Sequence, residues 1–333
     1  MKKFFAILLA SMMILSLCAC GNQAPVEPSA PAEPAPAPAE PAPAPVEPSV
    51  PAEPEAPALD TELPVRIMSL NGTTGFGFAK LISDNTAGSA ALNYEISVET
   101  DASNITAALI SGNVDIAALP TNAASVVYNK SQGAVQVLAL NTLGVLYVLA
   151  DSSENITALS DLEGKTVYAP AQNPSFIFQA VCKAAGEVKL AVLPEPMVTM
   201  ACAGNDQLTV ALDLTAEWDK VYPAGSLVQG CVVVRKAFAE EHPAEIAKFL
   251  EEYEASIAYL SEDTAAAAQM IVDAGIFAKA PVAQKAIPKC NLCFIAGADM
   301  EPALGEFLNT MSSVAPASVG GAVPASDFYY VAE

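Results

Sequence analysis

One sequence pattern occurs twice in this chain, and this repeat limits how the chain can fold more than any other feature. The pattern is a charged residue, then Ile or Leu, and then Ala-x-Leu-Pro, with Ser or Thr five residues after the proline. It spans 115–125 and 189–199. Residues 135–142 also match 208–215, and 65–79 match 165–180 more weakly. Such an internal repeat predicts two similar α/β lobes, and a cleft between lobes is a common ligand site.

The two copies of the repeat differ in length. The interval from Ile67 to Asp115 is 48 residues, whereas the matching interval from Val167 to Lys189 is 22. The second lobe is therefore expected to lack one strand–helix unit, the counterpart of residues 94–111. Either this lobe has a smaller sheet or the chain carries an internal deletion, and the exposed sheet edge that results would weaken or abolish ligand binding.

The first residues predict export and a lipid anchor. Lys2 and Lys3 precede an apolar run over 4–17, which is too short for a permanent membrane span. The junction that follows, 17–21, resembles a bacterial lipobox, and this resemblance makes 1–19 a signal peptide and Cys20 the lipid-modified first residue. The alternative is an ordinary secretory signal that is cut elsewhere. Several acyl chains anchor a protein durably, so we expect a lipid-anchored protein on the extracellular face of the cell membrane.

Residues 20–62 are expected to form a disordered tether. Residues 22–62 are rich in Pro, Ala and Glu and contain no Lys or Arg, so this segment cannot bury a core. Two interpretations remain open: the segment crosses a layer of the cell envelope, or it is a spacer whose length does not matter. The formal net charge of the chain is −22, which argues against nucleic acid as a partner and leaves the lipid as the only expected membrane contact.

The remaining chain alternates strand and helix patterns. Strands are expected at 65–70, 94–98, 114–119 and 135–140, with helices at 75–82, 103–111 and 122–128 between them. This alternation predicts two lobes, each a mostly parallel sheet covered by helices, with Pro120 and Pro194 at equivalent strand ends. Lobe 1 is expected to comprise 63–146 and 232–333, and lobe 2 to comprise 147–231. A monomer is expected.

Ligand-binding residues are expected where strands end and helices begin, because ligands of α/β sheets sit beyond the carboxyl ends of the strands. Free N–H groups at helix starts also point into that space. The residues selected by this rule are Asn71, Thr73, Thr74, Gly75, Thr121, Asn122, Asn141 and Thr142 in the first lobe, and Asn173, Ser175 and Glu195 in the second. Each has a structural alternative as a turn residue, a packing glycine or a helix cap. Glu195 in particular either binds an amine or ring N–H of the ligand or only complements a helix dipole.

No catalytic or metal-binding constellation is found in the sequence. The only histidine, His242, precedes Pro243 at an expected helix entrance, and GxSxG, P-loop and HExxH motifs are absent. Cys290 and Cys293 have CxxC spacing without a second such pair, which favours buried thiols over a zinc site. We therefore expect no metal and no cofactor.

Four segments resemble solute-binding lipoproteins of ABC importers. They are 65–80, 99–129 with its Gly112–Ala117 step, 155–167 with its Asp-Leu-x-Gly-Lys-Thr-Val element, and 231 onward from Cys231. The nearest group includes nitrate, sulfonate, taurine and thiamine-precursor binders. The resemblance covers about 64–330 and implies a periplasmic-binding-protein type II fold, with crossings between lobes near 145–149 and 230–234. It also implies a small-molecule ligand and a permease with its ATPase as partners.

Three functional classes are compatible with the sequence. The first is a solute receptor that delivers its ligand to an ABC importer, and the second is a sensory binding lipoprotein that does not transport. The third is an enzyme of thiamine-pyrimidine synthesis, against which the anchor, the tether and the single exposed histidine weigh. The ligand remains open: a neutral or amine-bearing heterocycle suits Glu195, while an anion held by backbone N–H groups is the alternative.

Overall fold

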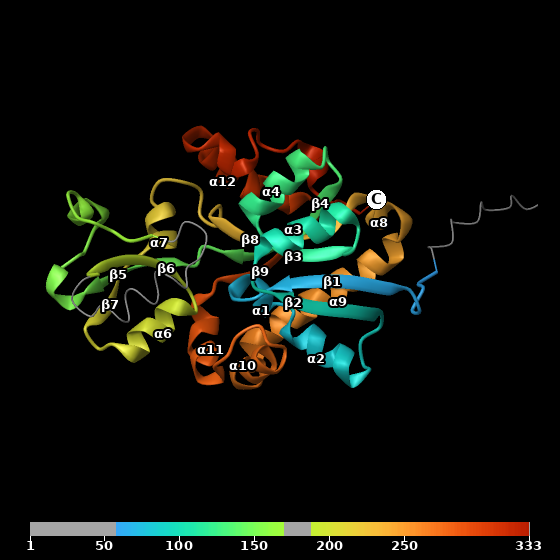
Figure 1. Ribbon diagram of the computed structural model, residues 1–333, viewed down its shortest axis with the longest axis horizontal. Coiled ribbons are helices and arrows are strands. Elements are labelled where there is room, and N and C mark those ends of the chain that lie inside the picture. The colour runs from blue at the N-terminus through green and yellow to red at the C-terminus, as the bar shows by residue number, and fades with distance from the viewer. Residues whose placement is uncertain (1–57, 170–187, 333) are drawn as a thin grey trace, which may run out of the picture. The chain divides into compact units, whose positions relative to one another are not determined.

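The computed structural model describes residues 58–169 and 188–332, which form two sheets with helices around them (Figure 1). The larger sheet has six strands in the order β2-β1-β3-β8-β4-β9, and the smaller has three in the order β6-β5-β7. The six strands are β1 (Pro64–Leu70), β2 (Asn93–Glu99), β3 (Ile116–Pro120), β4 (Val135–Leu143), β8 (Val228–Arg235) and β9 (Leu292–Ala296). The three are β5 (Leu146–Asp151), β6 (Leu190–Pro194) and β7 (Leu208–Asp213).

Helices cover both faces of the six-stranded sheet. On one face lie α3 (Ala102–Ser111), α4 (Thr121–Lys130) and α12 (Met300–Val314), and on the other α2 (Ala79–Ala87), α8 (Lys236–Glu241) and α9 (Pro243–Glu262). Strand β3 shows why: Ala117 and Leu119 pack in the first core and Ile116 and Ala118 in the second. A strand buried on both faces has a continuous apolar sequence, as 116–119 does.

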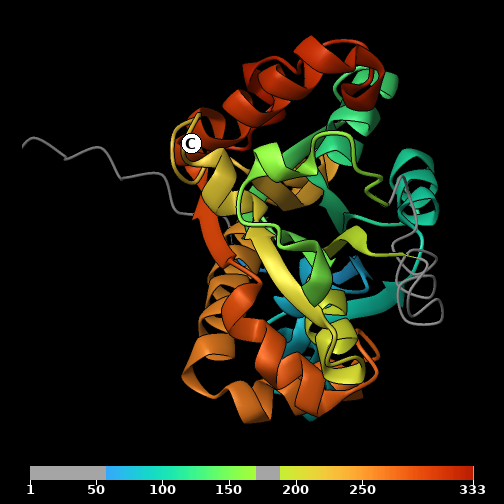
Figure 2. The same cartoon turned by 90° about the vertical axis from the view of Figure 1, so that its left-hand side faces the viewer.

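The structure describes five further helices. They are α1 (Thr73–Phe76), α6 (Met197–Gly204), α7 (Leu214–Trp218), α10 (Thr264–Asp273) and α11 (Ala280–Ala286). Short 3₁₀ turns are η1 (Ser152–Glu154), η2 (Leu159–Leu162), η3 (Ile287–Lys289), η4 (Gly297–Asp299), η5 (Pro316–Val319) and η6 (Ser326–Phe328). Figure 2 looks onto the end with the three-stranded sheet and shows α12 on one side of that end and α10 with α11 on the other. No helix among the described residues has the length and apolar character needed to span a membrane.

The sheets are less parallel than the sequence predicts. Strand β1 pairs in parallel with β2 and β3, but β3–β8, β4–β8, β4–β9, β5–β6 and β5–β7 are antiparallel. For the four antiparallel pairings that involve β5 or β8, the cause is the path of the chain between sheets. It leaves the large sheet along β4, enters the small sheet along β5 and returns along β8, so the entering strand runs against its neighbours in each sheet. The expected crossings at 145–149 and 230–234 thus fall largely on β5 and β8. The connecting segments between the two sheets lie just before these strands.

The two prolines of the repeat occupy equivalent positions. Pro120 ends β3 opposite Gly230 in the incoming strand β8, and Pro194 ends β6 opposite Leu146 in the incoming strand β5. Tyr168 also forms a parallel bridge with Ala191 of β6, as β1 does with β3. Within the described residues, no strand corresponds to β2 in the small sheet.

The helix expected over 75–82 is divided into α1 and α2. Ser256 of α9 donates its hydroxyl to the carbonyl oxygen of Gly77 at 2.5 Å and accepts the N–H of Leu81 at 3.0 Å. This side chain therefore replaces the Leu81–Gly77 bond that a continuous helix would form. Insertion of a side chain into the backbone ladder is a known cause of helix breaks, and no local sequence pattern indicates it here.

The described N-terminal end contacts α9. Asp60 donates its N–H to Glu245 Oε1 at 2.7 Å, and the carbonyl oxygen of Glu62 accepts a bond from Asn93 at 3.3 Å. Residues 58–62 of the expected tether are therefore in contact with the large sheet and its helices, while Cys20 and residues 1–57 lie outside the described part of the chain.

Candidate functional site

The candidate site lies where the two sheets are joined. Between β4 and β5 the chain passes through Gly144 and Val145, and the N–H of Val145 donates to Gln229 Oε1 in β8 at 2.7 Å. Asn291, which precedes β9, donates its side-chain amide to the carbonyl oxygen of Gly144 at 2.6 Å and accepts the N–H of Leu143 at 3.0 Å. Both crossings are thus held by polar side chains rather than by apolar packing alone.

A buried polar cluster lies on the large-sheet side of this junction. The Asn141 amide donates to the carbonyl oxygen of Thr74 at 3.0 Å and to the Tyr253 hydroxyl at 2.9 Å. Its Oδ1 accepts the Thr142 hydroxyl at 3.0 Å, and Asn141 and Thr142 are each 1% exposed. Gly230 in β8 has no room for a side chain, since a Cβ there would lie 2.6 Å from Asn141 Oδ1. The structure therefore brings together three of the predicted residues: Thr74, Asn141 and Thr142.

Other predicted residues surround this cluster. The Thr121 hydroxyl at the start of α4 donates to the carbonyl oxygen of Val228 in β8 at 2.7 Å, so Thr121 joins α4 to the returning crossing. Gly75 in α1 approaches the end of β1 so closely that a Cβ would lie 1.9 Å from the carbonyl oxygen of Leu70. Gly75 is therefore required by packing, which is the structural alternative that the sequence analysis gives for a glycine. Thr73 is buried beside it, while Asn122 is half-buried.

Asn71 lies at the outer edge of this group. Its side chain is exposed, and its N–H donates to the carbonyl oxygen of Glu99 at the end of β2. Asn173 and Ser175, predicted for the second lobe, fall outside the described residues. No described contact joins Asn71 or Asn122 to the small sheet.

Glu195 is the best-defined predicted residue of the small sheet. It follows β6, is 1% exposed, and accepts the N–H of Thr199 at 3.1 Å and the Thr199 hydroxyl at 3.0 Å. Burial raises the pKa of Glu195, while the two bonds from Thr199 and the charge of Lys289 oppose that rise. The carboxylate thus occupies the N-terminus of α6, the role that the helix-dipole interpretation assigned to it.

Several residues of the junction were missed from the sequence. Tyr253 packs among apolar residues of α9, yet its buried hydroxyl accepts the Asn141 amide. The Tyr147 hydroxyl in β5 donates to the carbonyl oxygen of Lys289 at 2.9 Å, which joins the small sheet to η3. The available signal was chemical: a tyrosine in an apolar stripe needs a partner for its hydroxyl.

One buried hydroxyl at the junction has no partner. Thr215 Oγ1, at the start of α7, is enclosed and makes no hydrogen bond among the described residues. A Cβ on Gly144 would lie 2.2 Å from this oxygen. Gly144 thus allows Thr215 of α7 to approach the first crossing. Gly230 in the same way allows Thr142 of β4 to approach β8.

One cavity borders the junction at Asn291. It has a volume of about 600 Å³ and is bounded by the C-terminal half of α9, η3 and β9, including Asn291 and Cys293. The second, about 410 Å³, lies between α3 and α8 at the far end of the large sheet. Neither cavity is lined by a predicted site residue.

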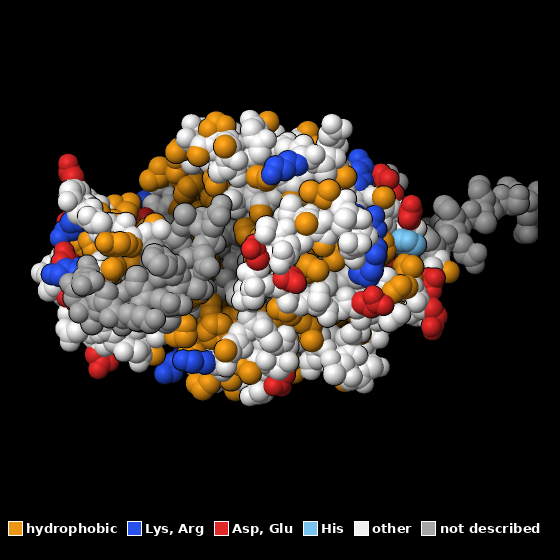
Figure 3. Space-filling model, in the orientation of Figure 1, with side chains coloured by type: hydrophobic (Ala, Val, Ile, Leu, Met, Phe, Trp, Pro, Cys, Tyr) orange, Lys and Arg blue, Asp and Glu red, His pale blue; other side chains and the backbone are white. Residues whose placement is uncertain are grey.

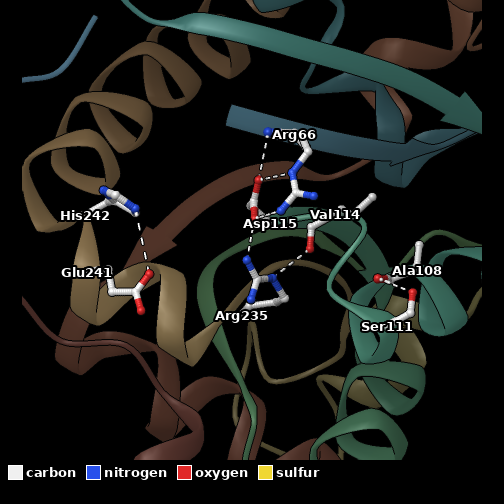
Figure 4. A network of polar contacts seen from close by, with 8 residues as sticks. All are labelled: Arg66, Ala108, Ser111, Val114, Asp115, Arg235, Glu241 and His242. Carbon is white, nitrogen blue, oxygen red and sulfur yellow. Dashed lines mark hydrogen bonds and ion pairs between the residues drawn. The ribbon is translucent and has the colours of Figure 1, made fainter. Parts of the chain in front are cut away.

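The two arginines of the chain lie at that far end, away from the junction (Figure 4). Arg66 donates its Nε, Nη2 and backbone N–H to the Asp115 carboxylate at 2.8, 2.6 and 3.1 Å. Arg235 donates Nη2 to the same carboxylate at 2.6 Å and Nε to the Val114 carbonyl oxygen at 3.0 Å. Burial acts to raise the pKa of Asp115, but the bonds from Arg66 and Arg235 outweigh it and hold that pKa below its usual range.

Metal-binding and redox chemistry find no support among the described residues. No group of three or more His, Cys, Asp or Glu side chains there is arranged to hold a metal ion. Cys231 and Cys290 are fully buried, and burial raises the pKa of the Cys293 thiol to about 12, so these thiols stay protonated. His242 is part-exposed between α8 and α9, with Glu241 at 3.9 Å. On the face drawn in Figure 3, Lys and Arg side chains form small separate groups.

Comparison with known proteins identifies the fold. Residues 89–195 match the family model described as NMT1/THI5 like. An ABC transporter protein from Parabacteroides distasonis superimposes with a TM-score of 0.69 at 22% identity, covering 82% of this chain and 100% of that one. The chain has the periplasmic-binding-protein fold. The resemblance expected from the sequence is thereby confirmed.

Two further structures share this periplasmic-binding-protein fold. The periplasmic aliphatic sulphonate binding protein SsuA of Escherichia coli has a TM-score of 0.61 at 12% identity, covering 81% of this chain and 92% of that one. A zinc-bound ligand-binding component of an ABC-type import system from Staphylococcus aureus has the same TM-score and identity, covering 81% and 97%. A comparison with curated protein sequences finds no match.

Proposed function

We propose that this protein is the extracytoplasmic solute-binding component of an ABC importer. The observation that carries the proposal is the junction: two sheets joined by two glycine-containing crossings, with buried Asn, Thr and Tyr groups gathered around them. Ligands of two-lobed proteins bind between the lobes, and polar groups on both sides fix their orientation. The structurally similar proteins named as ABC transport components support the same assignment.

The ligand site is proposed at the junction of lobe 1 (63–146 and 232–333) with lobe 2 (147–231). The described residues proposed for it are Asn71, Thr73, Thr74, Gly75, Thr121, Asn122, Asn141, Thr142 and Glu195. In this proposal Thr74, Asn141 and Thr142 form its floor, because their hydrogen bonds tie α1, β4 and α9 together. Rotation about the two crossings closes the lobes on the solute, as in hinge-closing binding proteins.

The anchor and the partners complete the proposal. Cys20 carries the lipid, the Pro/Ala/Glu-rich segment tethers the globular part to the outer side of the membrane, and a permease with its ATPase receives the solute. The protein acts as a monomer and performs no catalysis. This part rests on the sequence alone, since residues 1–57, which include Cys20 and most of the tether, lie outside the described residues.

A thermal-shift screen of the non-lipidated chain against a broad library of small solutes tests the proposal. A solute at 100 times its Kd adds about 2.7 kcal/mol of stability, which raises Tm by several degrees. The mixture is then analysed for chemical change, because an enzyme would convert the solute whereas a binding protein returns it intact. The absence of any stabilising solute, or turnover of the one found, would contradict the proposal.

A further inference from the structure

The proposed site has no arginine available for an anionic solute. Both arginines of the chain hold Asp115, which precedes β3, whereas Thr121 follows the other end of that strand. Five residues of strand separate the two ends by roughly 16 Å. Arginine is the side chain best suited to binding oxyanions through two parallel hydrogen bonds. An anion in the proposed site would therefore depend on helix N-termini and lysines.

The helix N-terminus on the small-sheet side is already occupied. Anions bind where the first N–H groups of a helix are free. At α6, however, the buried Glu195 carboxylate accepts the N–H and the hydroxyl of Thr199. The N–H of Glu195 itself donates to the carbonyl oxygen of Val145, which places this carboxylate directly beside the crossing. The protein thus supplies its own anion at the position that a bound anion would take.

A second carboxylate lies at the same end of the small sheet. Asp213 ends β7, and its Oδ1 accepts the N–H groups of Thr215 at 2.8 Å and Ala216 at 3.4 Å. Tyr147 of β5 is its register partner. Glu195 follows Pro194, which pairs with the neighbouring Leu146, so both carboxylates lie at this end of the sheet. Burial raises the pKa of Tyr147, and the charges of Asp213 and Glu195 raise it further.

These observations specify the chemistry that lobe 2 presents to the solute. Resting on the proposed function, we infer that the solute turns a hydrogen-bond donor, such as a protonated amine or a ring N–H, toward the junction end of the small sheet. An aliphatic sulfonate without such a donor binds at least about tenfold more weakly, because like charges brought together at an interface repel. Lys289 is the nearby cation, and its charge acts on the buried Glu195 carboxylate.

Calorimetry on the non-lipidated chain tests the inference with matched pairs that differ only in an amine. The probes are 2-aminoethanesulfonate against ethanesulfonate, and 4-aminopyrimidine against pyrimidine, with nitrate as a simple anion. The amine-bearing member of a pair is expected to bind at least about tenfold more tightly. Glu195→Gln should reduce this preference roughly three- to tenfold, the effect of one charge acting through a partly polar interior.

The controls separate the possible failures. Asp84→Asn, on the outer surface of α2, should leave the preference unchanged, and circular dichroism shows whether each variant is folded. If Glu195→Gln does not fold, Asp213→Asn gives the same readout from the second carboxylate. Tight binding of ethanesulfonate or nitrate would overturn the inference and leave the proposed function intact. An unchanged preference in a folded variant also overturns it, and no binding by any probe or library solute overturns both.

Discussion

Replacement of Asp115 by Asn should destabilise the protein strongly, although Asp115 lies far from the junction. Asp115 is 1% exposed and its carboxylate accepts four N–H bonds from Arg66 and Arg235, as described above. Removing one partner of a buried ion pair costs about 3–5 kcal/mol, because the remaining charge is left uncompensated. The side chains of Arg66 and Arg235 are 37% and 24% exposed and can regain water, so we expect the lower end of that range.

Chemical denaturation measures this loss, with Asp84→Asn as the matched control. Asp84 pairs with Lys80 one helical turn away, at 2.6 Å, on the surface of α2, and such a pair contributes about 0.3–0.5 kcal/mol. We therefore expect Asp115→Asn to lower the free energy of unfolding by about 3 kcal/mol and Tm by roughly 6–12 °C. An effect no larger than that of the control would refute the reasoning.

The pH dependence gives an independent check. The pKa of Asp115 is lowered in the folded protein, so its carboxylate stabilises the fold above the unfolded pKa of about 3.9. That contribution is lost as the pH falls through the folded pKa. The difference in stability between the wild type and Asp115→Asn should therefore be complete at neutral pH and shrink below about pH 4. A difference that stays constant down to pH 3 would show that the ion pair is not its source.

Three further predictions concern the junction and the anchor. Gly75→Ala should destabilise the fold because its Cβ would lie 1.9 Å from a backbone carbonyl oxygen, while Gly204→Ala, which meets nothing within 4 Å, should be neutral or slightly stabilising by thermal denaturation. Tyr253→Phe removes the hydroxyl that Asn141 binds and should cost about 0.5–1.5 kcal/mol in denaturant titrations; an unchanged midpoint would contradict the role given to this bond. Cys20→Ala should abolish lipid modification, which mass spectrometry of the N-terminal peptide detects, and an unmodified Cys20 in the mature wild type would refute the anchor.

The sequence predicted the features that depend on local pattern. Pro120 and Pro194 end buried strands at equivalent positions because the apolar run before each proline cannot continue as a central strand. The order of elements from β1 to β4 was also predicted, because the alternation of strand and helix patterns is a local property of the sequence. The local sequence also placed Thr74, Asn141 and Thr142 at strand ends and helix starts, which the fold then gathered.

Features that depend on distant contacts were not predicted. The break between α1 and α2 is made by Ser256 of α9, far along the chain. The role of Asn141 depends on Tyr253, which also lies in α9. Four of the five antiparallel pairings follow from the direction in which β5 and β8 enter their sheets, and hydrophobic periodicity does not report that direction. Glu195 was placed correctly at a helix start, but only the hydrogen bonds from Thr199 show that this carboxylate is already engaged.

Hydrogen–deuterium exchange with a stabilising solute shows whether one solute contacts both lobes at the junction. We expect slower exchange in two places at once: residues 73–76 of α1 in the large-sheet lobe and residues 195–199 at the start of α6 in the small-sheet lobe. The far end of the large sheet around Asp115 should exchange at the same rate with and without solute. Protection confined to one lobe, or to the cavity between α9 and β9, would contradict the account.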